Sequence, residues 1–464
     1  MITYNFDHVE GSLYEYIYKC VKNDIISGKI SAGEKLPSKR NFAKNNGVST
    51  ITIQNAYDQL AGEGYIIAIP KKGYYAANIE GISKVNVAQQ VSLNIQLPKE
   101  EPEYIFDFSS NRTEADNFPF SIWSKLLREV ISVREKMLLE VSPAAGVFEL
   151  RQAIANHLNS FRGMNVDPNQ IVVGAGTDYL YGLLVKLLGK DRTYCIESPG
   201  YRKLQMIYDD EKVVNRYARM DEKGIRIDEL RRVGAEIAHI SPTHHFPTGI
   251  TMPISRRYEV LAWANESAKR YIIEDDYDSE FRLNGKPIPA LQSIDASGKV
   301  IYMNTFSKSL APTIRISYMV LPEKLANKFY RQLAFYSCTV STFEQYTLAA
   351  FISKGYFEKH INRMRLHYGR KRAQILGVIK SVFREEECKV LENDSGLHFL
   401  LQMNTKKSDH EIRDLMIKHS IKITPITDYD MSDDYEDRHQ FILNYSSMDV
   451  EGLEQALMVL KSVI

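Results

Sequence analysis

Polar side chains follow several short apolar segments in the C-terminal part of the chain, and one group of them could bind a phosphate. Its members are Gly176, Thr177, Thr305, Ser307 and Arg315. Gly176 and Thr177 come directly before a predicted helix over residues 178–188, and the free N–H groups and positive dipole end at the start of a helix suit an anion. The hydroxyl and guanidinium groups of the other three add donors for the same kind of ligand group. These residues therefore predict a phosphate-binding site.

A second group of residues offers the chemistry that an aromatic aldehyde needs. The ring of Tyr201 could lie flat on another ring, Asp275 could keep a pyridine nitrogen protonated, and Tyr277 could hydrogen-bond a ring hydroxyl. Lys308 carries an amine that can form a Schiff base with an aldehyde. A phosphate, a pyridine nitrogen, a phenolic oxygen and an aldehyde together describe pyridoxal 5′-phosphate, abbreviated PLP. The sequence predicts PLP as cofactor and Lys308 as the residue that reacts with it.

Taken alone, each of these residues has an ordinary structural explanation. A glycine-rich turn between a strand and a helix is more often structural, and a single lysine after a strand is usually solvated. His244 and His245 are expected to hydrogen-bond locally, and no third ligand is placed to complete a site around them, so no metal is predicted. The prediction of PLP rests on the joint occurrence of the residues, in order, at the ends of successive apolar segments.

The apolar segments themselves predict an α/β fold with a mainly parallel sheet. They cover residues 171–173, 194–196, 237–240, 271–273 and 300–303, and they alternate with helical patterns. In such sheets, ligands bind beyond the carboxyl ends of the strands. The residues that follow the segments should therefore meet at one edge of the sheet.

The first eighty residues predict a different kind of domain. Apolar spacing predicts a helix over 13–26, a second helix from the N-cap Ser38 to before Gly47, and a third from the N-cap Ser49 to Gly62. Two apolar runs, 65–69 and 74–77, enclose the sequence Pro-Lys-Lys-Gly and predict a hairpin with a basic tip. This order of elements is that of a winged helix-turn-helix.

Such a domain binds double-stranded DNA, and its basic and small polar residues are the candidate contacts. Candidates for phosphate contact are Lys39, Arg40, Lys44, Lys71 and Lys72, candidates for base edges are Ser49, Thr50, Thr52, Gln54 and Asn55, and Ser38 is a further candidate DNA contact. On charge alone, the basic run over residues 35–44 is equally typical of a solvated helix face. The order of the elements favours DNA.

The composition sets broad limits. The chain has 464 residues with 59 basic and 58 acidic side chains, so no global charge argues for nucleic acid. It lacks a secretion signal and any apolar stretch long enough to span a membrane, and its four scattered cysteines fit a reduced, cytoplasmic setting. Residues 78–103 lose periodicity and end in a Pro- and Glu-rich stretch. We therefore expect a DNA-binding domain over 1–77, a linker over 78–103 and a ligand-binding domain over 104–464.

Two stretches resemble known families. The segment LPSKRNFAKNNGVSTITIQNAYDQLAGEGYI is similar to the GntR-type winged helix-turn-helix. The segments SPAAGVFELRQAIANHL, IESPGY, SPTHHFPTG, IIEDDYDSEFR and NTFSKSLAPTIRISYMVLP resemble fold-type I aminotransferases, and the combination resembles the MocR/GabR family. The resemblance implies a large α/β domain and a small C-terminal α+β domain that bind PLP and pair as a homodimer. It also implies that Lys308 is the Schiff-base lysine, Asp275 the partner of the pyridine nitrogen and Tyr277 that of the phenolic oxygen. Tyr201 would be the stacking ring, with Gly176, Thr177, Thr305, Ser307 and Arg315 in the phosphate cup.

The chain departs from these families at several positions. Thr50 stands where the GntR pattern usually has an arginine, and Phe246 stands where many aminotransferases have an asparagine. Ile442 occupies the position of the arginine that holds a substrate carboxylate, and Asp428 lies where GABA-responsive members place theirs. Arg438 is nearby, and we expect it to be a surface residue.

These observations predict a PLP-dependent transcription regulator in which an aminotransferase-like domain senses PLP itself or an amino compound and controls operator binding. The target genes would belong to vitamin B6 synthesis or amino-acid metabolism. The alternative is an active aminotransferase with an accessory DNA-binding domain. A scaffold without a cofactor would require Lys308 and Asp275 to be coincidental.

Overall fold

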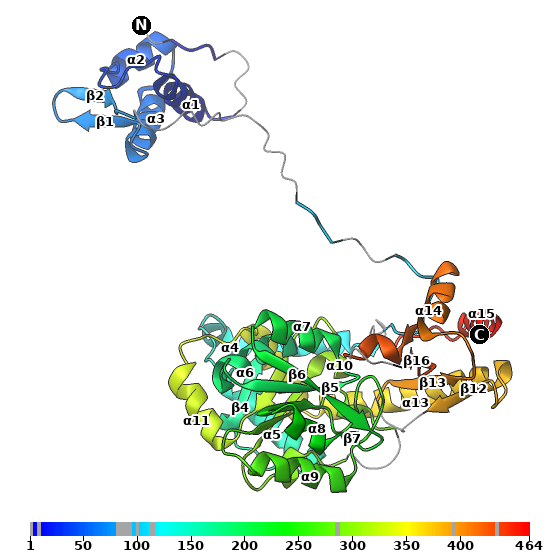
Figure 1. Cartoon of the computed structure of the whole chain (residues 1–464). Helices are drawn as coiled ribbons and strands as arrows, with labels where there is room; N and C mark the ends of the chain where they lie inside the picture. Colours follow the sequence, from blue (N-terminus) through cyan, green and yellow to red (C-terminus); the bar gives the residue numbers. More distant parts are fainter. Residues whose placement is uncertain are drawn as a thin grey trace. The chain divides into compact units, whose positions relative to one another are not determined.

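The computed structural model describes residues 3–6, 11–79, 95–98, 102–110, 117–283, 288–391, 396–431 and 436–464. The chain divides into two compact units, Met1–Glu100 and Glu101–Ile464, which Figure 1 draws in the colours of the sequence. The linker predicted over residues 78–103 lies largely outside the described residues.

The N-terminal unit has the predicted order of elements. It contains α1 (Leu13–Ile26), α2 (Lys39–Asn46), α3 (Thr50–Gly62), β1 (Ile66–Ile69) and β2 (Gly73–Ala76). Ser38 and Ser49 cap α2 and α3, because their side chains accept from the backbone N–H groups of Asn41 and Thr52 at 3.3 and 3.1 Å. Apolar faces of the three helices and the hairpin pack into one buried core around Phe42 and Tyr57. The winged helix-turn-helix fold is confirmed.

The C-terminal unit is built on an eight-stranded sheet. Its strands, in spatial order, are β4 (Ile171–Gly174), β11 (Ser317–Val320), β10 (Val300–Thr305), β9 (Tyr271–Asp275), β8 (Ile237–Ile240), β5 (Thr193–Ser198), β6 (Val214–Asp221) and β7 (Gly224–Ile225). Strands β10, β9, β8, β5 and β6 are parallel to one another, whereas β11 runs antiparallel to both β10 and β4. The mainly parallel sheet is confirmed, and all five predicted strands belong to it.

Helices cover both faces of this sheet. They are α4 (Phe120–Leu138), α5 (Phe148–Arg162), α6 (Thr177–Leu188), α7 (Arg202–Asp210), α8 (Ile227–Arg232), α9 (Ile254–Asn265), α10 (Phe306–Ser309), α11 (Glu323–Gln332) and α12 (Thr342–Ser353). Successive strand residues point to opposite faces. Val173 and Tyr302 accordingly pack with α5 and α12, whereas Val172 and Met303 pack with α6 and α11. The sheet is therefore buried on both sides.

A smaller α+β part completes the C-terminal unit. Its antiparallel sheet has the order β12 (Cys388–Leu391), β13 (His398–Met403), β16 (Gln440–Asn444) and β15 (Thr424–Pro425). The long helix α13 (Tyr356–Val382) and the helices α14 (Asp409–Lys418) and α15 (Leu453–Val463) pack with it, as Figure 1 shows. Strand β3 (Phe106–Asp107) pairs in parallel with β14 (Ile421–Lys422). Short 3₁₀ helices cover Pro168–Gln170, Ser279–Phe281, Gln292–Ile294 and Ile426–Tyr429.

Candidate functional site

A cavity of about 340 Å³ lies where the parallel strands of the large sheet end. The predicted cofactor residues that line it are Thr177, Tyr201, Asp275, Tyr277, Thr305, Ser307, Lys308 and Arg315. They come from the start of α6, the turn before α7, the end of β9 and the residues just after it, and the segment from the end of β10 to the start of β11. The fold thus brings together side chains that the sequence separates by up to 138 residues, counted from Thr177 to Arg315.

The first end of the cavity is suited to an anion. Gly176 precedes α6 with a φ of 90°, and a Cβ added to it would lie 2.3 Å from Nη2 of Arg315. Only glycine allows the guanidinium to approach the start of this helix so closely. Arg315 also contacts Asp178 at 3.3 Å, and Lys203 pairs with the same carboxylate at 2.6 Å. Backbone N–H groups and a guanidinium therefore converge at this end.

Two of the hydroxyl groups of this end, those of Thr305 and Ser307, are held by their neighbours. Oγ1 of Thr305 accepts from the backbone N–H of Ser307 at 3.1 Å and from the hydroxyl of Ser317 at 2.8 Å. The hydroxyl of Ser307 donates to the carbonyl of Ile314 at 2.9 Å. These bonds fix the turn between β10 and α10, which carries Lys308.

Lys308 is a buried amine with an unusual pKa. Burial lowers its pKa to about 8, against the opposing effect of the negative charge of Asp278. Among the described residues, its amine makes no hydrogen bond or ion pair. A neutral, unpartnered amine in a cavity is a nucleophile, and this is the state that an aldehyde requires.

Asp275 presents one oxygen to the protein and keeps the other free. Its Oδ2 accepts from the hydroxyl of Tyr181 at 2.5 Å and lies 3.5 Å from Nε2 of His239. Its Oδ1 is buried and has no hydrogen-bond partner. A buried carboxylate oxygen is costly to leave unpaired, so it calls for a cationic N–H donor from a ligand. A protonated pyridine nitrogen is such a donor, and the residues present fit the cofactor.

Tyr181, Tyr208 and His239 support Asp275 and were not predicted from the sequence. Burial raises the pKa of Tyr208 well above its ordinary value, and its hydroxyl shares a hydrogen bond with Nδ1 of His239 at 2.7 Å. The other ring nitrogen of His239, Nε2, lies 3.5 Å from Oδ2 of Asp275. The three side chains lie inside α6, α7 and β8 rather than after a strand, so no pattern of strand ends could have found them.

Tyr277 lies in a second polar group on the same wall. Its hydroxyl is 3.3 Å from Nδ1 of His244, and that nitrogen is 2.8 Å from Oδ2 of Asp278. His245 bonds Thr248 at 2.8 Å, and burial lowers the pKa of His245 to about 3. The local hydrogen bonding expected for the two histidines is confirmed for His245, whereas His244 contacts side chains 33 and 34 residues along the chain. No group of three or more potential metal ligands occurs in the part of the chain that the structure describes.

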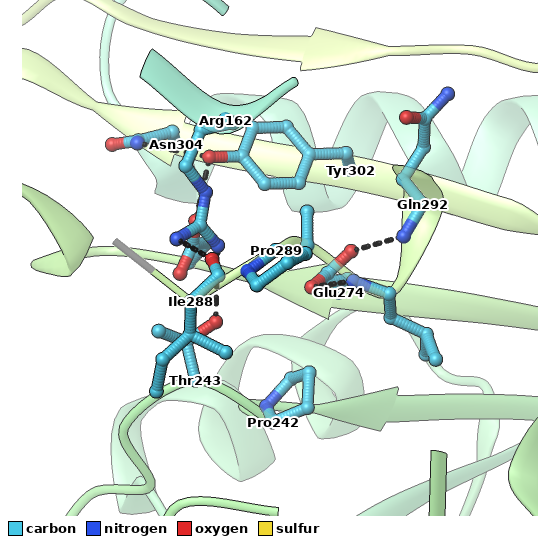
Figure 2. A network of polar contacts seen from close by, with 12 residues as sticks. Arg162, Pro242, Thr243, Glu274, Ile288, Pro289, Gln292, Tyr302 and Asn304 are labelled. Atoms are coloured by element: carbon cyan, nitrogen blue, oxygen red, sulfur yellow. Dashed lines mark hydrogen bonds and ion pairs between the residues drawn. The ribbon is translucent and has the colours of Figure 1, made fainter. Parts of the chain in front are cut away.

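A buried ion pair behind the cavity supports the end of β9. Arg162 pairs with Asp276 at 2.8 Å, and both side chains are about 1 % exposed. Arg162 also donates to Thr243 and to the carbonyl of Ile288, and Tyr302 donates to Asp276 at 2.6 Å (Figure 2). Nearby, Glu274 accepts from two backbone N–H groups, and burial raises its pKa. This network holds residues 274–276 rigidly on the protein side of the cavity.

The N-terminal unit carries the candidate DNA contacts on α2, α3 and the hairpin. Arg40, Lys44, Thr50 and Asn55 are exposed, and so are Lys71 and Lys72 at the hairpin turn, whereas Lys39, Thr52 and Gln54 are half-buried. The amide of Gln54 is engaged on both sides, because it accepts from the amine of Lys39 and donates to Asp58 at 2.6 Å. Lys39 also lies over the ring of Tyr74 in β2. Hydrogen bonds thus link α2 to α3, and a cation–π contact links α2 to the hairpin.

Comparisons with known proteins agree with both units. The model of bacterial regulatory proteins of the gntR family matches residues 13–75, and that of aminotransferase class I and II matches residues 105–460. The uncharacterized HTH-type transcriptional regulator YdeL of Bacillus subtilis (strain 168) is 37% identical, over 89% of each chain. The probable rhizopine catabolism regulatory protein MocR of Rhizobium meliloti is 28% identical, over 97% of this chain and 93% of its own. The chain belongs to the MocR/GabR family of transcription regulators.

The solved structures show the same fold. The multiple substrate aminotransferase from Thermococcus profundus superposes with a TM-score of 0.69 at 23% identity, over 79% of this chain and 92% of its own. This likeness confirms the fold-type I aminotransferase architecture of the C-terminal unit. Among the described residues, no helix is long and apolar enough to cross a membrane.

This MocR/GabR-type regulator departs from an aminotransferase at the wall opposite the phosphate end. Ile442 is buried in β16 and packs with Leu400 and Ile426 beneath the rings of Phe246 and Tyr429. The position that usually carries a carboxylate-binding arginine is therefore occupied by an apolar side chain, and that side chain has apolar neighbours.

Two arginines of the small α+β part, Arg413 and Arg438, are each already in contact with an aspartate. Asp428 is ion-paired with Arg413 at 2.9 Å. Arg438 contacts Asp430 at 3.4 Å, and its side chain is 42% exposed, so the predicted surface position is confirmed.

Proposed function

We propose that the chain binds PLP in the cavity of its C-terminal unit and uses the occupancy of that cavity to control its affinity for an operator. The observation that carries the proposal is the meeting, in one cavity, of a buried amine at Lys308, an unpaired carboxylate oxygen at Asp275 and, at Thr177, a helix start that suits an anion. A phosphate, a pyridine nitrogen and an aldehyde satisfy these three groups together.

Each residue of the cavity would contact a different group of the cofactor. Gly176, Thr177, Thr305, Ser307 and Arg315 would hold the phosphate, Asp275 the pyridine nitrogen, Tyr277 the phenolic oxygen, and Tyr201 would cover the ring. The bound cofactor supplies an electrophilic carbon that a primary amine can engage. Lys308 contributes an amine whose lowered pKa increases its neutral fraction, and the support behind Asp275 keeps that carboxylate fixed.

Control of an operator requires the state of the C-terminal unit to change how the N-terminal unit binds DNA. A two-fold homodimer, usual for PLP sites of this fold, would present two winged helix-turn-helix units to a repeated half-site. The effector would be PLP itself or an amino compound, and the target genes would serve vitamin B6 synthesis or amino-acid metabolism. A DNA target and a PLP supply both place such a regulator in the cytoplasm.

An active aminotransferase with an accessory DNA-binding unit is less well supported. Turnover of an α-amino acid needs a cation for the substrate carboxylate, and the usual position holds Ile442 within an apolar cluster.

The proposal is tested by operator binding with and without cofactor. A duplex enriched from random sequence by the full-length protein serves as probe, and its dissociation constant is measured for PLP-loaded protein and for protein stripped with hydroxylamine. We expect the two constants to differ at least fivefold, and Lys308→Ala to lose most of the difference. Equal affinity of loaded and stripped wild-type protein would refute control by the cofactor.

A further inference from the structure

The wall of the cavity that faces away from the phosphate end carries a charge pattern of its own. Among the described residues that line the cavity, the cations are Lys203, Lys308 and Arg315. Lys203 and Arg315 both contact Asp178 at the start of α6, and the amine of Lys308 has its pKa lowered by burial. Neither surface-paired arginine of the small part, Arg413 or Arg438, lines the cavity. Among the residues that the structure describes, the remaining wall therefore has no cation to pair with a carboxylate.

The charge states of the titratable groups in that wall also disfavour a carboxylate. Burial lowers the pKa of His245 to about 3 and that of His398 well below its ordinary value, so both rings are neutral at physiological pH. Burial raises the pKa of Glu197 to about 8, which leaves this acid mostly neutral. Asp275 and Asp278 also line the cavity. An added carboxylate would therefore meet neutral rings, a mostly neutral Glu197 and the carboxylates of Asp275 and Asp278, the second of which already contacts Nδ1 of His244 at 2.8 Å.

Aromatic and aliphatic side chains form the rest of this wall. The ring of Phe246 lies 5.3 Å from that of His398, 5.1 Å from that of Tyr429 and 6.3 Å from that of Tyr201. Ile442 packs behind them, and Leu397 lines the cavity beside His398. Such a surface gains free energy by covering an apolar body.

We propose that the effector of this regulator is a primary amine with an apolar body and no carboxylate, held between Lys308 and the rings of Phe246 and Tyr201. This inference rests on the proposed function, because the cavity must first hold its cofactor. The amine nitrogen lies on the side of Lys308, and the apolar body takes the place that a substrate carboxylate and its arginine fill in an aminotransferase. Asn444, which lines the cavity two residues after Ile442 on the same face of β16, offers its side-chain amide as a donor to a neutral polar group.

The test uses pairs of ligands that differ only by a carboxylate. PLP-loaded full-length protein, dialysed free of unbound PLP, is titrated by calorimetry at pH 7 with 2-phenylethylamine and L-phenylalanine, and with butylamine and 4-aminobutyrate. We expect each amine to bind at least tenfold more tightly than its carboxylated partner, and 2-phenylethylamine to change operator affinity. Phe246→Ala should weaken 2-phenylethylamine more than butylamine.

A gain-of-function variant sharpens the result. Ile442→Arg should reduce the preference for the carboxylate-free member at least tenfold, whereas the matched Ile442→Met should keep it. The wild-type titrations decide the question if the arginine variant does not fold.

The opposing outcomes separate this inference from the proposed function. Carboxylated ligands that bind wild-type protein as tightly as their partners, or amines that do not bind at all to PLP-loaded, DNA-binding protein, would overturn the effector class alone. A protein that retains no PLP would overturn the proposed function.

Discussion

The lowered pKa of Lys308 predicts how fast the protein takes up its cofactor at different pH values. Its pKa falls from the ordinary 10.5 to about 8 because burial disfavours the charged amine. Only the neutral amine attacks an aldehyde, so the rate of uptake should follow the neutral fraction. We expect the rate to rise about tenfold per pH unit below pH 8 and to level off above it.

The size of the effect follows from the shift. At pH 7, an amine with a pKa of about 8 is neutral in roughly one molecule in ten, whereas an ordinary lysine is neutral in roughly one in three thousand. The buried amine should therefore react roughly 300-fold faster than an exposed lysine of equal intrinsic nucleophilicity at that pH. The negative charge of Asp278 raises the pKa of Lys308. Removing that charge should therefore move the midpoint of the rate profile to lower pH.

The assay is stopped-flow absorbance during the addition of PLP to stripped protein from pH 6 to pH 10. The same series with α-acetyl-lysine corrects for the titration of PLP itself. Asp278→Asn should shift the corrected midpoint downward, and the matched Asp178→Asn, at the phosphate end of the same cavity, should leave it in place. A corrected midpoint near 10.5 for wild-type protein, or an upward shift for Asp278→Asn, would show that burial does not set this pKa.

Three further predictions concern DNA, assembly and support of the site. Replacing Arg40, Lys71 and Lys72 by alanine in the full chain should weaken binding to all duplexes alike and lower the salt slope by about one per lost phosphate contact; an unchanged slope in fluorescence anisotropy would argue against these contacts. Light scattering of PLP-loaded protein at micromolar concentration should give the mass of a dimer, and a monomer would contradict the proposed assembly. Arg162→Met leaves Asp276 buried without its cation, so urea unfolding should show a loss of about 3–5 kcal/mol, and a loss below about 1 kcal/mol would mean that the pair contributes little.

The sequence predicted the elements that depend on local chemistry. The caps Ser38 and Ser49 and the turn at Gly47 bound the helices of the N-terminal unit, and the apolar runs before Gly176 and Asp275 correspond to strands β4 and β9. Spacing along the chain is enough for these features because each depends on neighbours within a few residues.

Other features depend on contacts that no local pattern encodes. The antiparallel strand β11 inserts between β4 and β10, and strand order in a sheet is a matter of tertiary packing. Tyr181 and His239 reach Asp275 from 94 and 36 residues away along the chain, counted from their residue numbers. In the sequence both look like ordinary residues of a buried helix and strand, because only the fold shows what their polar atoms face.

The account depends most directly on the chemistry of Lys308. Full-length protein loaded with PLP is treated with borohydride, digested and mapped by mass spectrometry, with Lys308→Ala as the matched control. We predict a single phosphopyridoxyl group on Lys308, and none in the variant, which should keep its fold and much of its PLP affinity because Arg315 and the start of α6 still bind the phosphate. A phosphopyridoxyl group on another lysine, or on none, would contradict the assignment of the cavity as a PLP site.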